Sequence, residues 1–265
     1  MPIYRFLWLC LPLVLCCTPT QAHEFWIVPH DAVTHSGAMV VFELRIGPNW
    51  PGLQSARLPG LFSSFVMRDS DGTQTISGRD GAMAVGHVQM RQPGAAVVAL
   101  RTNPARLTLP GTEFEPYLSE EGLDDVLAFR HKNGMQGQPG RELFSRSAKA
   151  IILVDGQSDG YDRVLNLPLE LIPLNDPLQF KPMARFSLRL MLNGQPLPKA
   201  LVKAQLKADI PVELGARTDS LGVASFVLPS SGIWLFNAVH MESSMEAVAD
   251  WESIWASLTI ALQQR

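Results

Sequence analysis

The strict alternation of apolar and polar residues from Ala184 to Leu192 is the feature that most constrains the fold. The apolar residues of one parity are Phe186, Leu188, Leu190 and Leu192. Only an extended strand, whose successive side chains point to opposite faces, gives such a segment one apolar face. The Asn193-Gly194 pair that follows predicts a tight turn. The chain therefore reverses and builds an antiparallel sheet with one buried face.

The same pattern continues toward the C-terminus. Between Val202 and Lys207, apolar residues alternate with lysine and glutamine, which predicts a strand with one core face and one wet face. Further strands are expected at 223–228, 233–241 and 254–262, with turns between them. These segments predict an immunoglobulin-like β-sandwich domain over residues 166–265.

The first half of the chain also favours strands. The segments 25–28 and 40–46 are rich in apolar, β-prone residues. The segments 82–90 and 95–101 are predicted to be two arms of an antiparallel pair around Gln92-Pro93-Gly94. We therefore expect an N-terminal β-sandwich over residues 23–165.

A helical insertion, at about residues 113–147, is expected to interrupt this first sandwich. Apolar residues recur at helical spacing within 120–132, and Lys132 and Gly134 are typical of a helix C-terminus. The segment 114–118 is expected to add a helical turn, and 141–147 a further short helix. The predicted fold class is thus all-β, with two immunoglobulin-like or transthyretin-like sandwiches.

Residues 1–22 have the pattern of a secretory signal. Arg5 precedes the apolar run 6–17, and small residues at Thr20 and Ala22 predict cleavage after Ala22. The run is short for a bilayer span, which needs roughly 20 residues, and no later stretch is apolar enough. A periplasmic mature chain without a transmembrane segment is expected, with no cysteine left for a disulfide. In the alternative, a lipid on Cys16 or Cys17 tethers the protein.

Cleavage after Ala22 makes His23 the first residue of the mature chain. An amino-terminal histidine presents its α-amine and its imidazole Nδ1 to one metal ion. This donor pair suits a divalent transition metal, either nickel or cobalt, with copper as an alternative. In the plain alternative, cleavage happens to fall before a solvated histidine.

Three further residues are candidate metal ligands. His240 lies in an expected strand with the parity of Trp234, Phe236 and Ala238, and is either a ligand or a core histidine with one hydrogen bond. His87 is a candidate third ligand. Asp250 is a candidate oxygen donor, or a carboxylate that orients a ligating imidazole, or a solvated surface group.

The sequence also excludes several classes of function. A net charge of -3 without a basic run argues against nucleic acid as a partner. No nucleophile elbow, phosphate-binding loop or zinc-protease helix is present, so an enzyme is not expected. The one enzymatic alternative is a copper-dependent polysaccharide oxygenase, because those enzymes also begin with histidine on a β-sandwich.

Several ordered segments resemble a bacterial domain-of-unknown-function family linked to nickel and cobalt uptake, like a nickel uptake substrate-specific component. The segments are 23–26, 117–123, 145–150, 238–241, 250–253 and 255–259. This resemblance implies a metal cation as cargo and a membrane metal transporter as partner. Residues 193–197 and 218–222 resemble the sandwich modules found beside carboxypeptidases, which are binding or spacer units and imply no catalysis.

The function expected from the sequence is therefore an exported periplasmic metal-binding accessory protein. The alternative from a different class is a metal-free structural or adaptor protein of the envelope.

Overall fold

The computed structural model describes residues 24–208 and 210–264. The expected signal at 1–22, with Cys16 and Cys17, and the expected first residue His23 lie outside the described residues. Among the residues described, no helix is long and apolar enough to cross a membrane.

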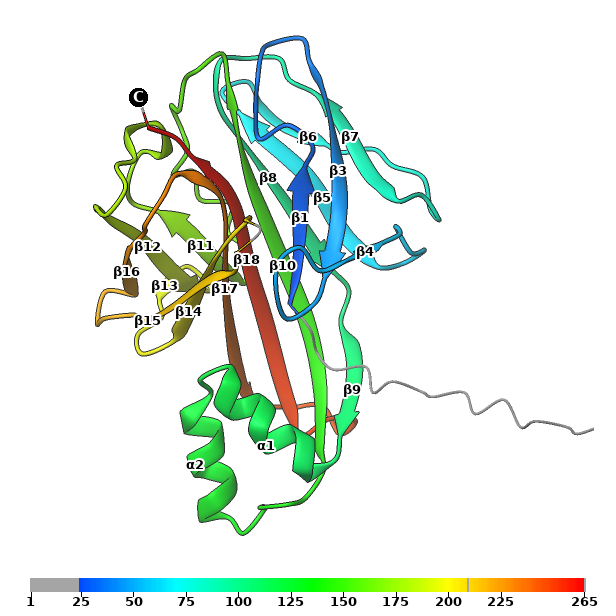
Figure 1. The fold of residues 1–265 in the computed structure, drawn as a ribbon. Helices are drawn as coiled ribbons and strands as arrows, with labels where there is room; N and C mark the ends of the chain where they lie inside the picture. The colour runs from blue at the N-terminus through cyan, green and yellow to red at the C-terminus, as the bar shows by residue number, and fades with distance from the viewer. Residues whose placement is uncertain (1–23, 209, 265) are drawn as a thin grey trace, which may run out of the picture.

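The described chain forms three sheets (Figure 1). The first sheet contains β1 (Phe25–Pro29), β3 (Met39–Ile46), β4 (Leu53–Ser55) and β7 (Ala84–Gln89). The third sheet contains β11 (Leu169–Pro173), β12 (Arg185–Leu192), β13 (Gln195–Pro196) and β16 (Val223–Val227), and the short 3-10 helix η1 (Pro177–Gln179) lies between β11 and β12.

The central sheet is the largest and runs through both halves of the chain. Its main path is β15 (Val212–Arg217), β14 (Leu201–Leu206), β17 (Gly232–Ser243), β18 (Trp251–Leu262), β10 (Gly140–Val154), β8 (Gly94–Thr102), β5 (Phe62–Asp69) and β6 (Gly72–Thr75). The short strands β2 (Val33–Thr34) and β9 (Ala105–Leu109) also pair with β10.

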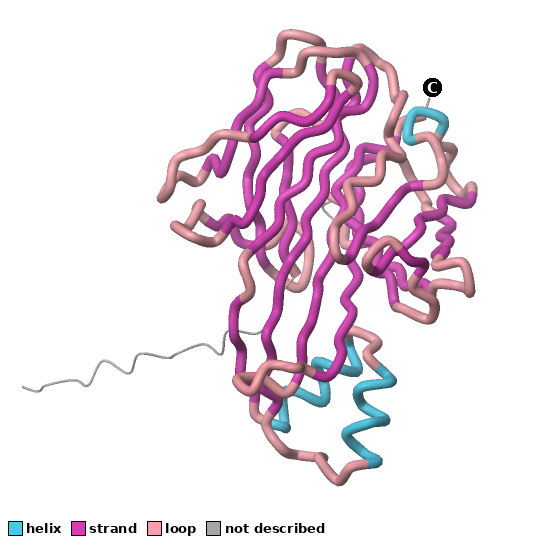
Figure 2. Tube along the Cα trace, turned by 180° about the vertical axis from the view of Figure 1, so that it is seen from behind, coloured by secondary structure: helices cyan, strands magenta, loops and turns pink. Residues whose placement is uncertain are grey.

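The central sheet is a wall shared by two hydrophobic cores. Along β10, Ala150 and Ile152 pack with residues of the first sheet, whereas Ile151 and Leu153 pack with residues of the third sheet. This is the two-residue period of a strand buried on both faces. The prediction of an all-β fold with two sandwiches and a short helical insertion is confirmed, and Figure 2 shows the strands as the dominant element.

The two halves of the chain are joined in the middle of this sheet. Strand β10 pairs in parallel with β18 from Glu142 opposite Trp251 to Ile151 opposite Ile260. On its other side β18 pairs antiparallel with β17 along its whole length. The last strand thus lies between a strand of the first half and a strand of the second.

The helical insertion is shorter than predicted. It consists of α1 (Gly111–Glu120) and α2 (Asp124–Lys132), which pack on β17 and β18 through Val239, Met241 and the indoles of Trp251 and Trp255 (Figure 1). The single helix predicted over 120–132 was wrong at its start, because the chain turns at Gly122, where φ is +67°. The backbone of Gly122 adopts this left-handed conformation without the steric cost of a side chain.

Two further predictions are corrected. The segment 141–147 is not a helix but part of the 15-residue strand β10, whose backbone is paired with β9 and β18. The segments 82–90 and 95–101 are not partners, because β7 pairs with β3 while β8 pairs with β5 and β10. The turn at Pro93-Gly94 does reverse the chain. It connects β7 of the first sheet to β8 of the central sheet, so it does not close a hairpin.

Strand β1 fills the corner between the two sandwiches and is buried along its whole length. Phe25 and Ile27 enter the core of the first sandwich, while Trp26 packs with Leu235 of β17. Thr259 of β18 donates a hydrogen bond of 2.8 Å from Oγ1 to the carbonyl of Ile27. The start of β1 therefore lies against the central sheet, near the residues of β17.

Candidate functional site

The first described residue, Glu24, has a buried carboxyl group and lies directly before β1. It is only 3% exposed. Its carbonyl accepts a hydrogen bond of 3.0 Å from the backbone N–H of Gly47. Its Oε2 accepts a bond of 2.6 Å from Nδ2 of Asn237 on β17. Both the backbone and the side chain of this residue are therefore held in place.

Two more charged groups gather around Glu24. Lys203 of β14 places its Nζ 2.8 Å from Oε1 of Glu121, which follows α1, and 3.6 Å from Oε1 of Glu24. Lys203 and Glu121 are each 12% exposed at their side chains. We call Glu24, Glu121, Lys203 and Asn237 the Glu24 cluster. It joins residues that are far apart in the sequence.

The cluster contains two acidic residues and one basic residue, and burial shifts their pKa values. Burial, followed by the nearby Glu121, raises the pKa of Glu24 to about 8, although Lys203 acts in the opposite direction. Burial also raises the pKa of Glu121. Burial lowers the pKa of Lys203, but Glu121 and Glu24 outweigh it and the net shift is upward. One ammonium therefore lies beside two buried carboxyl groups, of which Glu24 keeps its proton at neutral pH.

The cluster also leaves polar atoms without hydrogen bonds. Among the described residues, Oε1 of Glu24, Oδ1 of Asn237 and Oγ of Ser257 are buried and accept or donate none. Asn237 on β17 has two cross-strand neighbours, which are Ser257 on β18 and Lys203 on β14. Oε1 of Glu24 is compensated by the Lys203 ammonium at 3.6 Å, so the polar groups of this part of the sheet are only partly satisfied.

His240 lies on β17 but belongs to the other face of the central sheet. Side chains alternate along a strand, so Asn237 and His240 have opposite parity. Trp234, Phe236 and Ala238, which share the parity of His240, enter the core under the third sheet. The His240 side chain is 26% exposed, and its Nε2 lies 4.0 Å from Oε2 of Glu242. Burial lowers the pKa of His240 despite this carboxylate.

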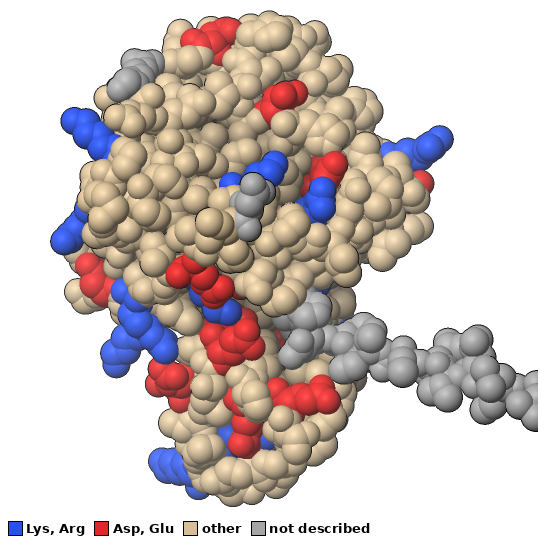
Figure 3. Space-filling view, in the orientation of Figure 1, with Lys and Arg blue, Asp and Glu red and all other residues tan. Residues whose placement is uncertain are grey.

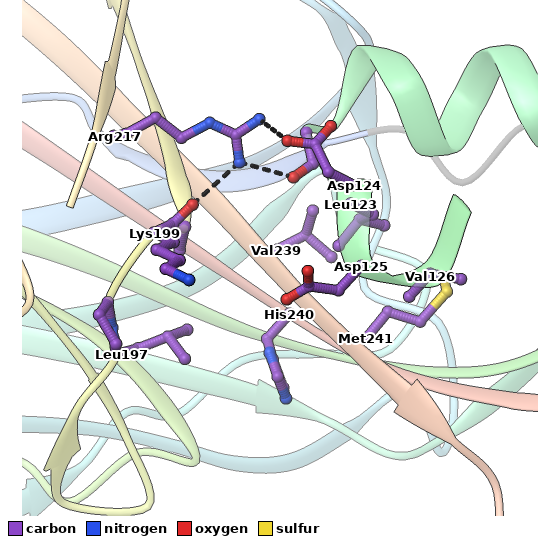
Figure 4. Close-up of a pocket in the computed structure, with 13 residues that line it drawn as sticks. Leu123, Asp124, Asp125, Val126, Leu197, Lys199, Arg217, Val239, His240 and Met241 are labelled. Atoms are coloured by element: carbon purple, nitrogen blue, oxygen red, sulfur yellow. Dashed lines mark hydrogen bonds and ion pairs between the residues drawn. The ribbon is translucent and has the colours of Figure 1, made fainter. Parts of the chain in front are cut away.

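A cavity of about 170 Å³ lies beside His240, between the turn joining α1 and α2 and the loop before β14 (Figure 4). Arg217 closes one side of it. The Arg217 guanidinium donates at 2.6 Å to Asp124, at 2.8 Å to the carbonyl of Gly122 and at 2.9 Å to that of Lys199. Figure 4 shows the carboxylate of Asp125 directed toward the side where His240 lies.

The remaining predicted ligands lie elsewhere. His87 is exposed on β7 of the first sheet. Asp250 is bound by Arg141, whose Nε and Nη2 approach the carboxylate at 3.1 and 2.5 Å. This hydrogen-bonded guanidinium lowers the pKa of Asp250. Within residues 24–208 and 210–264, no three histidine, cysteine or acidic side chains come together as a metal-binding group.

The face drawn in Figure 3 shows how charge is distributed outside the cluster. Acidic side chains gather where the helical insertion meets the two sandwiches, with fewer basic side chains among them. Within the helical insertion, the first turn of α2 carries two acidic residues, Asp124 and Asp125.

Sequence reasoning missed Glu24, Lys203 and Asn237. Lys203 and Gln205 were assigned to a wet face, which is wrong because β1 and the loop between β3 and β4 cover it. Gln205 is 3% exposed and accepts a hydrogen bond of 2.9 Å from the backbone N–H of Trp50. The sequence did contain one signal of this buried site. Lys203 is the only charged residue of β14, and all other residues of that strand are apolar or carry an amide.

Comparison with known proteins assigns this β-sandwich protein to an uncharacterised domain family. The chain belongs to the family described as "Domain of unknown function (DUF4198)", whose model matches residues 20–242. Membership of an uncharacterised family is thereby confirmed. No curated protein matches the chain.

Two solved structures are similar at low identity. The D0-D1 domain of intimin is 11% identical, with 90% of this chain and 97% of that chain covered and a TM-score of 0.22. The native conformation of Escherichia coli alpha-2-macroglobulin is 11% identical, with 91% and 14% covered and a TM-score of 0.24.

Proposed function

We propose that the protein is an exported periplasmic accessory that binds a divalent transition-metal cation at its mature amino terminus. Nickel or cobalt is the proposed cargo, and copper the alternative. The observation that carries the proposal is the buried group of two acidic residues, Glu24 and Glu121, around Lys203, because Glu24 directly follows His23 in the chain.

The chemistry of the two neighbouring residues is complementary. The α-amine and imidazole of an amino-terminal histidine are neutral nitrogen donors, and consecutive Cα atoms are about 3.8 Å apart. A cation held by these nitrogens lies one residue from the buried carboxyl group of Glu24. The nitrogen pair supplies the affinity, and Glu24 places an acidic side chain next to it.

The proposal does not depend on the other predicted ligands. His240 has the opposite parity to Asn237 on β17, and Asp250 is bound by Arg141. His87 lies in the first sheet. The metal site is therefore proposed at the start of β1.

We further propose a membrane metal transporter as the partner. The support is the resemblance of the chain to a family linked with nickel and cobalt uptake. The acidic surface beside the helical insertion is a suitable contact for a partner that carries positive charge (Figure 3).

Native mass spectrometry tests this function. The protein is exported through its own signal, without an amino-terminal tag, and measured before and after addition of nickel(II), cobalt(II) or copper(II). A mass beginning at His23 with one retained ion is expected, and His23→Ala is expected to lose that ion. His35→Ala, which changes an exposed histidine, is the matched control.

The other outcomes are equally informative. A mass that begins at His23 but retains no ion contradicts metal handling and favours the metal-free envelope adaptor. A lipid on Cys16 or Cys17 removes the amino-terminal chelate, and with it the proposed function.

A further inference from the structure

We infer that the cavity beside His240 is a binding site for a small zwitterion of the α-amino acid class. In this site Lys199 pairs with the carboxylate of the ligand, and Asp125 pairs with its ammonium group. The inference goes beyond the proposed function, because none of these residues belongs to the metal site at the start of β1.

The cavity lies beside an open edge of β17. Strand β14 pairs with β17 only as far as Val202 opposite Ala238, although β17 continues to Ser243. Within the described chain, no strand pairs with residues 239–243 on that side. The turn joining α1 and α2 and the loop before β14 instead border a space of about 170 Å³ (Figure 4). Liquid water takes about 30 Å³ per molecule, so this space equals roughly six waters and suits one amino acid rather than a longer peptide.

The open edge directs backbone groups of Met241 toward the cavity. Along an antiparallel strand, successive residues direct their N–H and C=O groups to alternate sides. The carbonyl of Ile233 accepts a hydrogen bond of 2.8 Å from the N–H of Lys207, which lies on the β14 side. Met241 has the same parity as Ile233, so its N–H and C=O also point away from β18, toward the cavity that it lines. A ligand there meets one backbone donor and one backbone acceptor.

Two opposite charges line the cavity and are not paired. Lys199 and Asp125 are both exposed, and both border this space. Within residues 24–208 and 210–264, neither side chain makes a hydrogen bond or an ion pair. Figure 4 shows the amino group of Lys199 and the carboxylate of Asp125 turned toward the same open space from opposite sides. The two charges are therefore available to one ligand placed between them.

Arg217 holds the two sides of the cavity together. Its guanidinium donates to the carbonyl of Lys199 on the loop and to the carbonyl of Gly122 in the turn. It also pairs with Asp124 at 2.6 Å. Arg217 and Asp124 thus compensate each other, which leaves Asp125 as the uncompensated carboxylate of α2. The loop and the turn are tied, so the spacing between Lys199 and Asp125 is set before a ligand arrives.

This arrangement favours a zwitterion over a simple ion. A lone cation attracted by Asp125 is repelled by Lys199, and a lone anion attracted by Lys199 is repelled by Asp125. A molecule that carries both charges a few bonds apart satisfies both side chains at once. Its carboxylate also accepts from the N–H of Met241, and its ammonium donates to the C=O of that residue.

The remaining walls leave room for an apolar side chain of the ligand. Leu123, Val126 and Met241 border the cavity and are themselves buried. His240 completes the wall. Burial lowers the pKa of His240, so its imidazole is neutral at neutral pH and offers a hydrogen bond without adding charge. Leucine, with an apolar side chain, is therefore the probe to use.

The test is calorimetric titration of the full processed protein with leucine, in the presence of a metal chelator. Two analogues are titrated in parallel. Isocaproate is leucine without its amino group, and isopentylamine is leucine without its carboxylate. Leucine is expected to bind, and each analogue is expected to bind about 10-fold more weakly, because each loses a hydrogen-bonded ion pair.

Two variants assign the charges to the residues. Lys199→Gln and Asp125→Asn are each expected to weaken leucine binding by about 10-fold. Asp125→Asn should also lose most of the preference for leucine over isocaproate, because the ammonium group of leucine no longer has its partner. A purely structural role of Asp125 would not change this preference. Lys181→Gln and Asp162→Asn make the same changes at exposed positions elsewhere and are the matched controls.

The outcomes that overturn the inference are equally definite. Circular dichroism first establishes that each variant is folded. Equal affinity of leucine and its two analogues refutes recognition of both charges. Failure of glycine, leucine, glutamate and lysine alike to bind below about 10 mM refutes the amino acid site. Because the chelator removes metal, neither result bears on the amino-terminal metal site, which native mass spectrometry tests separately.

Discussion

The ammonium of Lys149 lies 2.7 Å from Oε1 of Glu170, and both side chains are only 1% exposed. Lys149 belongs to β10 of the central sheet and Glu170 to β11 of the third sheet. Glu170 also accepts backbone hydrogen bonds from Leu165 at 2.8 Å and Leu167 at 3.1 Å. This buried ion pair fixes the segment that leads from the central sheet into the second sandwich.

Lys149→Met is expected to lower the free energy of unfolding by about 3–5 kcal/mol, because Glu170 is left buried without its cation. Urea unfolding measures this. Arg45→Met, which breaks the more exposed pair with Glu43, is the control and should cost less than about 1 kcal/mol. Equal effects for the two variants would show that burial of the Lys149 pair is energetically unimportant.

Gly52→Ala is expected to disturb the packing of Trp26. At Gly52 φ is +63°, and an added Cβ would lie 2.6 Å from the Trp26 indole and 2.9 Å from the carbonyl of Ile46. Overpacking of this kind costs about 1–3 kcal/mol. Thermal unfolding followed by tryptophan fluorescence measures it.

The control for this change is Gly60→Ala, since φ at Gly60 is +71° but nothing lies within 4 Å of the added Cβ. Gly60→Ala therefore measures only the cost of placing an alanine at a positive φ. A Gly52→Ala protein as stable as Gly60→Ala would mean that the contact with Trp26 does not constrain the loop.

Glu142→Gln is expected to flatten the pH dependence of stability. Burial raises the pKa of Glu142 above 4.5, against the hydrogen bonds from Ser253 and Tyr117. Above about pH 4.5 the unfolded chain therefore loses this proton before the folded protein does. The contribution of Glu142 is full below that pH and is lost as pH rises through the folded pKa, by at most about 1.4 kcal/mol per pH unit.

Urea unfolding of both proteins between pH 4 and pH 8 isolates this contribution, because all other groups are shared. The difference between their unfolding free energies should change across the window. Two parallel curves would be incompatible with a raised pKa at Glu142.

Arg217→Ala is expected to loosen the turn between α1 and α2 without unfolding the protein. Its side chain is 43% exposed, so solvent weakens the pair with Asp124 and the global cost should stay below about 1 kcal/mol. Hydrogen exchange should nevertheless speed up at residues 122–126, where Arg217 binds the carbonyl of Gly122. Lys181→Ala, at an exposed position after η1, is the control. Unchanged exchange at 122–126 would show that Arg217 does not hold the turn.

The sequence predicted best those strands that bury one face. Phe186, Leu188 and Leu190 alternate with polar residues, and β12 begins and ends close to the predicted bounds. Strand β10 was harder, because its first half carries two charged residues. Glu142 is buried and accepts a hydrogen bond from Tyr117, and the guanidinium of the half-buried Arg146 lies over the rings of Phe25 and Phe144. Charged residues there resemble a solvated helix in sequence, and only the pairing with β9 and β18 makes them a strand.

The candidate site was predictable only in part. The amino-terminal histidine remains a prediction from the signal pattern. The partners of Glu24 are Lys203 and Asn237, which are about 180 and 213 residues further along the chain. No local pattern carries that information, because β1 reaches β17 only through tertiary packing. His240 was predicted as a ligand, but its side chain points to one face of the central sheet. Asn237, three positions earlier on β17, points to the opposite face, where it contacts Glu24.

The position of β18 between β10 and β17 also sets an order of assembly. Its 12 residues are the last strand of the chain, yet they complete the middle of the central sheet. Pairings between residues more than a hundred positions apart form slowly, because a long loop must close first. Until β18 arrives, β10 and β17 present open edges that are templates for aggregation. Folding of both sandwiches is therefore gated by the final strand, and a chain that stops before Trp251 should collect as insoluble aggregate.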